Sequence, residues 1–333
     1  MSKDSETPMP ARRRAGPDRL VGASRAIQTV REQIAVAARG RFPVWIQGED
    51  GIDRELVARL IHDGSEWTRG GFFALDASVV PAALVGRELL GCAANAIPAL
   101  PGSYVGAFQR CAGGTVLVEE LQSVPKDVQQ SIASAIEEGV FRRTGESEER
   151  AFECRLIGAG RGRLDSLASD GGLISGLLER MKLLELFLPP LRERPEDIVP
   201  LAAQALASAR GELQEETGLA SEVRGFSPSA IEQLVSYSWP GNDRELREHI
   251  RAALRLAKGD EIGSEDIVLG WDSEASVPPF REAKRAFERE YVTRVLRLCR
   301  GNISRAARIA RKDRKDFYDV MRRNSIDPQQ FRS

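Results

Sequence analysis

The chain of 333 residues is poor in metal-binding side chains and in long apolar segments. It has two histidines, His62 and His249, which excludes a histidine-rich metal site. Its four cysteines are scattered without the spacing of a metal site, so we expect reduced, mostly buried thiols. No apolar run reaches the ~18 residues of a membrane span. The polar N-terminus also lacks an apolar signal core, so we expect a cytoplasmic protein without a membrane partner.

Charge is distributed unevenly along the chain, although the net charge is only −1. Residues 280–333 carry 16 Lys+Arg against 7 Asp+Glu, a net of +9, so the rest of the chain carries −10. A small basic module on an acidic body is typical of a nucleic-acid-binding tail domain. Residues 1–19, which include Arg12 to Arg14, read as a disordered basic arm. We expect no receiver or ligand-sensing domain ahead of the core, because the arm leaves no room for one.

The central stretch is residues 43–62, in which a short buried strand is followed by a Gly-rich turn and a helix. These are the parts of a phosphate-binding P-loop, whose motif is G-x-x-x-x-G-K-[ST]. Gly48 matches the first glycine, but the second falls on Asp53 and the lysine on Arg54. Asp53 puts a carboxylate where a phosphate should lie, and the planar Arg54 does not replace a compact ammonium.

A second motif ends a strand with two carboxylates. Gly113 to Val118 read as a turn and a buried strand, followed by Glu119 and Glu120. This is the Walker B pattern, in which the acidic pair serves Mg²⁺ and a water. The acidic pair is therefore the candidate Mg²⁺ site.

The remaining pattern alternates strands with helices and then becomes helical. Strands are predicted at 72–76 and 155–159, and an irregular loop at 91–103. Residues 195–268 read as helices only, so we predict a parallel α/β domain with an α-helical lid. The predicted helices are 24–39 with Ser24 as N-cap, 54–62, 81–90, 124–138, 173–184, 196–209, 228–236 and 244–257. The predicted divisions are 1–19 (arm), 20–191 (α/β core), 192–269 (lid), 270–279 (linker) and 280–333 (C-terminal domain).

The C-terminal domain is predicted to contain a long helix, 281–299, and two short ones, 303–310 and 313–324. The short pair forms a helix-turn-helix, for which a solvated three-helix bundle is the alternative. An apolar stripe on the long helix, including Tyr291 and Val295, would pair two copies on double-stranded DNA. The candidate DNA-binding residues are Arg305, Arg308, Arg311 and Lys312 for phosphates, Arg314, Lys315 and Tyr318 for base edges, and the exposed Arg322 and Arg323.

Four segments together resemble the AAA+ bacterial enhancer-binding proteins, the activators of sigma-54 RNA polymerase. They are Leu20-Val-Gly22, Leu188-Pro-Pro-Leu-Arg-Glu-Arg194, Trp239-Pro-Gly-Asn242 with Arg244-Glu-Leu246, and Gly301-Asn-Ile-Ser-Arg-Ala-Ala307. The last is similar to a Fis-type helix-turn-helix. The resemblance implies an AAA+ P-loop core with a parallel sheet and helical lid, followed by an all-α DNA-binding domain. It also implies ATP or ADP with Mg²⁺ as ligand and self-association through the core.

The departures from this family fall on its working residues. The sensor asparagine aligns with Arg161, and one arginine finger with Ile174. The loop that touches sigma-54 aligns with 95–100, where Ile97 and Pro98 replace a Phe-Thr pair, so sigma-54 binding is not expected. Glu119 aligns with the family's Walker B aspartate, so the resemblance makes it the candidate Mg²⁺ ligand. Carried over by resemblance, the nucleotide-binding positions are Gly48, Glu49, Gly51, Arg54, Glu55, Glu119 and Arg244, and the catalytic candidates are Glu120 and Arg180.

The sequence therefore predicts a DNA-binding transcription regulator with an AAA+ domain that does not hydrolyse ATP. Two alternatives remain open at this point. One is an ATP-hydrolysing sigma-54-dependent activator with unusual motifs. The other is an interaction protein that modulates hexamers of an active relative.

Overall fold

The computed structural model describes residues 20–97, 101–218, 220–269 and 291–326, the last range with gaps at 294, 297–298, 300, 311 and 324–325. The chain forms two compact units, Met1–Val268 and Leu269–Ser333. The predicted arm, the linker and most of the predicted helix over 281–299 lie outside the described residues. Among the described residues, no helix is long and apolar enough to cross a membrane.

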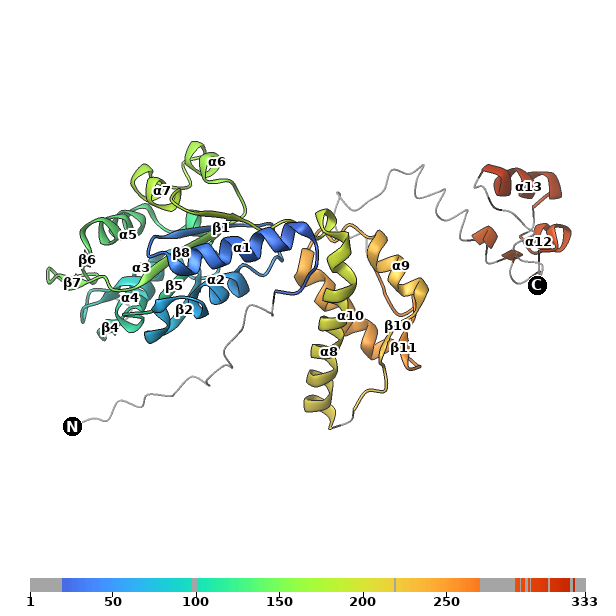
Figure 1. Cartoon of the computed structure of the whole chain (residues 1–333), viewed down its shortest axis with the longest axis horizontal. Helices are drawn as coiled ribbons and strands as arrows, with labels where there is room; N and C mark the ends of the chain where they lie inside the picture. Colours follow the sequence, from blue (N-terminus) through green and yellow to red (C-terminus); the bar gives the residue numbers. More distant parts are fainter. Residues whose placement is uncertain are drawn as a thin grey trace. The chain divides into compact units, whose positions relative to one another are not determined.

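A five-stranded parallel sheet forms the centre of the first unit, in the order β2-β5-β8-β1-β9 (Figure 1). Paired registers align Ile46 with Ala159 and Glu119 with Ala159. Because the strands are parallel, the P-loop turn, the acidic pair and the end of β8 lie together at the carboxyl ends of the strands. The strands are β1 (Val44–Gln47), β2 (Phe72–Asp76), β5 (Thr115–Glu119), β8 (Arg155–Gly160) and β9 (Glu185–Phe187).

Side chains of β1 alternate between two apolar cores, one on each face of the sheet. Val44 and Ile46 belong to the core shared with α1 (Arg25–Arg39) and α2 (Arg54–Asp63). Trp45 belongs to the opposite core, with residues of the helices α3 (Ala82–Leu90), α5 (Lys126–Glu138) and α7 (Ser175–Met181). Burial on both faces explains why residues 44–46 of β1 are a continuous apolar run. The predicted cap of α1 is confirmed, since Ser24 accepts a hydrogen bond from Ile27 N–H.

The lid consists mainly of α8 (Ile198–Thr217), α9 (Pro228–Ser236) and α10 (Asn242–Leu256). The prediction of helices alone over 195–268 was wrong at two places. β10 (Gly225–Phe226) and β11 (Glu261–Ile262) pair in parallel. Two-residue strands leave no alternation in the sequence, so only their long-range pairing defines them.

Other differences have the same cause. The helix predicted over 173–184 is shorter, spanning Ser175–Met181, and the unpredicted strand β9 (Glu185–Phe187) follows it and pairs with β1. The predicted loop over 91–103 begins with β3 (Gly91–Cys92), which pairs with β4 (Tyr104–Val105). A second hairpin joins β6 (Val140–Phe141) to β7 (Arg150–Ala151). Short helices α4 (Ala107–Arg110) and α6 (Leu164–Ser169) complete the core.

Buried polar contacts join the lid to the core within the first unit. Asp197 is fully buried and accepts hydrogen bonds from Ala23 N–H at 2.7 Å, Ser24 N–H at 2.9 Å and Ser24 Oγ at 2.6 Å. Asn242, also fully buried, donates to the backbone oxygen of Asp50 at 2.9 Å. The start of α10 is thus bonded directly to the P-loop turn.

The second unit contains α12 (Ile303–Ile309) and α13 (Arg314–Arg323). Their buried faces pack Ala306, Phe317 and Met321 in one small apolar core. Gly301 has φ 73°, and Asn302 then caps α12 by accepting from Arg305 N–H. Asp313 accepts a hydrogen bond from Lys315 N–H at 2.8 Å at the start of α13. Both short helices therefore begin where the sequence predicts, to within one residue.

Candidate functional site

The P-loop turn bonds closely to the lid at Gly51. This residue has φ +78°, and a Cβ added to it would lie 1.9 Å from the backbone oxygen of Gly241. Arg244 N–H donates to Gly51 O at 2.9 Å. Only glycine fits here, because both the left-handed backbone and the close approach exclude a side chain.

Asp53 caps α2 with its own carboxylate. Its Oδ1 accepts from Leu56 N–H at 2.9 Å, and its Oδ2 accepts from Arg247 Nη1 at 3.0 Å. A helix N-terminus attracts anions through its free N–H groups and its dipole. In this protein the carboxylate of Asp53 already meets that demand, and Arg247 of α10 forms a partly exposed ion pair with it.

Arg54 points into the site and lies against the acidic pair. Its Nη2 is 2.7 Å from Glu120 Oε1, and its Nε donates to Glu119 Oε2 at 3.3 Å. Its Nη1 donates to the backbone oxygen of Gly48 at 3.1 Å. Arg54 and Glu120 are buried, at 7% and 4% exposure, so water screens this pair weakly. Burial raises the pKa of Glu119, and the charge of Arg54 opposes that rise.

Arg161 extends this network beyond the end of β8. Its Nη1 is 2.6 Å from Asp50 Oδ2, and its Nε is 3.5 Å from Glu120 Oε2. Gln122 donates to the same Glu120 oxygen at 2.6 Å. Both oxygens of Glu120 therefore have partners within the chain. The sequence pointed to Arg161 only as a replacement for the family's asparagine.

An acidic cavity of about 500 Å³ surrounds these groups. Six carboxylates and four guanidinium groups line it, so its lining has a formal net charge of −2. An acidic lining opposes the entry of a polyanion. The carboxylates are Asp50, Asp53, Glu55, Asp76, Glu119 and Glu120, and the arginines are Arg54, Arg161, Arg244 and Arg247.

The other predicted site residues lie around this cavity or away from it. Glu49 forms two hydrogen bonds with Arg192, at 2.7 and 2.6 Å, and this contact lowers the pKa of Glu49. Glu55 pairs with Arg59 along α2. Arg180 donates to Gly176 O on its own helix and pairs with Glu137, and it does not line the acidic cavity.

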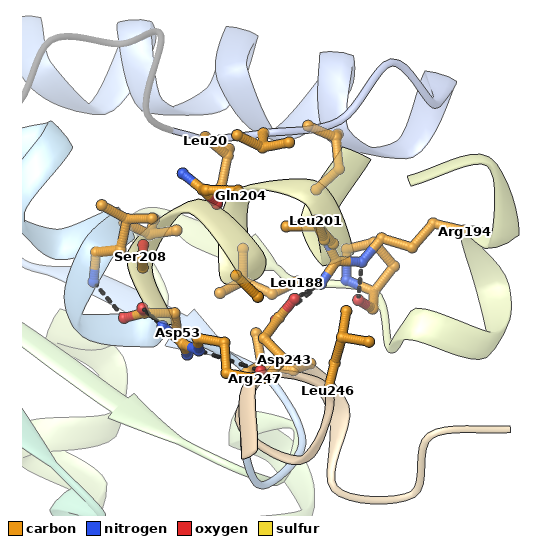
Figure 2. Close-up of a pocket in the computed structure, with 17 residues that line it drawn as sticks. Leu20, Asp53, Leu188, Arg194, Leu201, Gln204, Ser208, Asp243, Leu246 and Arg247 are labelled. Atoms are coloured by element: carbon orange, nitrogen blue, oxygen red, sulfur yellow. Dashed lines mark hydrogen bonds and ion pairs between the residues drawn. The ribbon is translucent and has the colours of Figure 1, made fainter. Parts of the chain in front are cut away.

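A second, smaller cavity of about 320 Å³ adjoins the first and was not predicted from the sequence. Figure 2 shows its lining, with Leu201, Gln204 and Ser208 of α8 on the lid side. Leu188 and Ile52 contribute apolar surface from the core. At its edge the buried Arg194 donates to both oxygens of Asp243, at 3.1 and 2.9 Å. Burial raises the pKa of Asp243, and Arg194 opposes the rise. Apolar residues shared by two subdomains leave no local motif, which is why the sequence did not reveal this cavity.

In the second unit, eight of the nine predicted DNA-binding side chains are described, and all eight are exposed. Arg311 lies outside the described residues. Asp316 and Asp319 are exposed on the same helix as Tyr318, so basic and acidic groups share the surface of α13. The eight are Arg305, Arg308, Lys312, Arg314, Lys315, Tyr318, Arg322 and Arg323.

Comparison with known proteins agrees with this architecture. The chain is 30% identical over 302 residues to the transcriptional regulatory protein GlrR of Escherichia coli K12, covering 90% of this chain and 67% of GlrR. It is 33% identical over 309 residues to the C4-dicarboxylate transport regulator DctD of Pseudomonas aeruginosa, covering 92% and 64%. The chain thus spans about two thirds of these relatives.

Solved structures give the same result. The chain superposes on NtrX of Brucella abortus with a TM-score of 0.66 and 27% identity, covering 92% of this chain and 69% of NtrX. The NtrX structure in complex with ATP gives a TM-score of 0.68 with 26% identity, covering 92% and 70%. The AAA+ ATPase lid domain family matches residues 192–277, and the sigma-54 interaction domain family matches residues 20–187. With its five-stranded parallel core and helical lid, the chain belongs to the sigma-54 interaction domain family of AAA+ transcription regulators.

Proposed function

We propose that this protein is a DNA-binding transcription regulator whose AAA+ domain does not hydrolyse ATP. One observation carries the proposal: the P-loop cation, Arg54, is held by both carboxylates of the acidic pair. In a working site the cation would contact phosphates and the carboxylates would serve Mg²⁺ and water. In this protein the guanidinium of Arg54 and the carboxylates of the acidic pair bind each other instead.

The family implies a nucleotide with Mg²⁺, and NtrX structures hold ADP or ATP. The residues of this chain do not fit the phosphates and the metal. Mg²⁺ needs free carboxylate oxygens, but Oε2 of Glu119, the predicted ligand, accepts from Arg54 Nε, and both oxygens of Glu120 are bonded to Arg54 and Gln122. Breaking a buried ion pair costs about 3–5 kcal/mol, which phosphate binding would first have to offset. A phosphate at the start of α2 would also meet Asp53.

Three features support the regulatory part of the proposal. The relatives GlrR and DctD are transcription regulators. The pair α12–α13, joined by a short turn, fits a Fis-type helix-turn-helix, with the basic start of α13 toward the major groove. The sequence of 95–100, of which 98–100 lie outside the described residues, has no aromatic-hydroxyl pair. We therefore propose that regulation acts through DNA occupancy and self-association, without sigma-54 contact.

A turnover assay tests the enzymatic half. The purified chain with Mg²⁺ and ATP should release no phosphate above background, and the variant Asp53→Gly/Arg54→Lys should bind nucleotide better than either single variant. The variant Lys258→Ala, on the exposed lid surface, is the control. ATP turnover by the wild-type chain at ~1 s⁻¹, an ordinary enzymatic rate, would instead identify an active ATP-driven activator.

A salt-series binding titration of the full chain against random and selected duplexes tests the DNA half. Arg314→Ala should cost ~1–3 kcal/mol on the selected duplex and alter sequence preference, if Arg314 reads a base. Arg305→Ala should weaken all sequences similarly and flatten the salt dependence. Lys258→Ala removes the same charge in the other unit and should change neither. Unchanged affinity in the double variant Arg314→Ala/Lys315→Ala would refute this placement of the interface.

A further inference from the structure

The two cavities of the first unit meet at one ion pair. Ile52, Asp53 and Arg247 line both of them. Asp53 Oδ2 and Arg247 Nη1 are 3.0 Å apart at this junction, where Figure 2 shows them joined. A ligand that fills the apolar cavity and extends toward the start of α2 must therefore pass the carboxylate of Asp53.

The apolar cavity has the size and chemistry of a small-molecule site. At about 320 Å³ it lies at the lower end of the ~300–1,000 Å³ that such sites occupy. Leu188 from the core and Leu246 from the lid are buried walls, which suit a flat, uncharged ring. Gln204 and Ser208 add an amide and a hydroxyl on the exposed side of α8, where they can pair with the polar edge of that ring.

The junction discriminates by charge. Asp53 is an acceptor, so it can receive hydrogen bonds from hydroxyl groups but repels phosphate. Beyond it, Arg54 and Arg161 are engaged with Glu120, and Arg247 is engaged with Asp53. Three of the four arginines that line the acidic cavity would have to leave carboxylates before they could hold a phosphate. A sugar without phosphates requires none of these breaks.

We infer that the apolar cavity binds a nucleoside without phosphates, with its base between core and lid and its sugar hydroxyls at Asp53. The inference rests on the proposed function, because it keeps the nucleotide frame of the family and removes the phosphate chemistry. It inverts the usual order of affinity: each added phosphate weakens binding. The ligand would then report the level of a neutral nucleoside to the lid, which contacts it through α8 and α10.

The test is isothermal titration of the full chain with adenosine, AMP, ADP and ATP, with and without MgCl₂. Adenosine should bind tightest, and ATP at least ~10-fold more weakly, a difference of about 1.4 kcal/mol. Higher salt should narrow the difference, because it screens the repulsion. MgCl₂ should raise the affinity for ATP only as far as it screens charge, with no further gain specific to ATP. ATP binding tighter than adenosine, or no adenosine binding, would overturn the inference.

Variants separate the charge gate from the cavity. Asp53→Asn keeps an acceptor for Leu56 N–H but removes the charge, so it should bring ATP affinity ~10-fold closer to that of adenosine. Asp170→Asn makes the same charge change on an exposed residue outside both cavities and should leave the ratio unchanged. Ser208→Trp, at an exposed position on the cavity wall, should abolish adenosine binding without changing the melting temperature.

Gln204→Trp provides a second block if Ser208→Trp does not fold. An unchanged adenosine-to-ATP ratio in Asp53→Asn, or full adenosine affinity in a folded blocking variant, would also contradict the inference. Failure here is distinct from failure of the proposed function. ATP that binds tightly without turnover overturns only the nucleoside inference, whereas turnover itself overturns the proposed function.

Discussion

The guanidinium group of Arg54 lies between two carboxylates, with its Nη2 2.7 Å from Glu120 Oε1 and 3.2 Å from Glu119 Oε2. The arginine comes from the first turn of α2, and the carboxylates come from the end of β5. Parallel pairing of the strands brings them to the same edge of the sheet. The contact therefore depends on residues more than sixty positions apart in the chain.

Removing Arg54 should destabilise the core. In Arg54→Ala, the buried Glu120 and the half-buried Glu119 lose their nearest cation, and of their described ion-pair partners only Arg161, 3.5 Å from Glu120, remains. Removing one partner of a buried ion pair typically costs about 3–5 kcal/mol. Urea-induced unfolding should show a lower midpoint with an unchanged slope. Arg41→Ala is the control, because its ion pair with Glu66 is exposed, at 79% and 88% for the two side chains. Equal midpoints for the two variants would contradict this account.

Gly51→Ala should separate the P-loop from the lid. The new Cβ would lie 1.9 Å from Gly241 O, and the left-handed backbone adds strain. Gly139→Ala has a comparable φ of +72° but no atom within 4 Å of the new Cβ, so it reports the strain alone. Thermal melting should show a larger loss for Gly51→Ala. If the two losses are the same, the close approach to Gly241 is unimportant.

Asp197 should be a major link between the lid and the first residues of the core. Asp197→Ala leaves the N–H groups of Ala23 and Ser24 without an acceptor in a buried site, at about 1–3 kcal/mol per group. Hydrogen exchange should rise at 20–30 and at the start of α8. Glu196→Ala changes the exposed neighbour and should leave exchange unaltered. Protection that stays intact in Asp197→Ala would refute the link.

His62 should make the stability depend on pH. Burial lowers its pKa, and its Nδ1 is 2.9 Å from Thr115 Oγ1. Below pH ~6.5, the ordinary pKa of histidine, this side chain binds a proton in the unfolded chain, whereas the folded chain binds that proton only at lower pH. Unfolding then takes up a proton, so the unfolding free energy falls as the pH drops from 7 toward 5.

The variant His62→Asn keeps a polar atom near Thr115 and removes the titration, so it should flatten this pH dependence. His249→Gln is the matched control and should preserve it. Melting temperatures measured between pH 5 and 8 give the comparison. If the pH dependence of the melting temperature survives in His62→Asn and disappears in His249→Gln, it arises from His249, and the assignment to His62 is wrong.

The sequence alone determined the elements with a strong local signal. The apolar run of β1, the glycines of the P-loop turn and the spacing of α1, α2 and α10 predicted a parallel α/β core with a helical lid, because periodicity and capping are local properties. It also revealed Asp53 and Arg54 as departures from a phosphate site. The sequence did not predict the strands β9, β10 and β11 or the two hairpins of the core, because short strands are defined by partners distant in the chain.

Tertiary structure decided what the departures do. Only the fold brings Arg54 to Glu119 and Glu120, Arg161 to Asp50, and Arg247 to Asp53. The apolar cavity likewise exists only where the lid meets the core. Charges at a sheet edge interact according to distance and burial, and neither quantity is written in the order of residues.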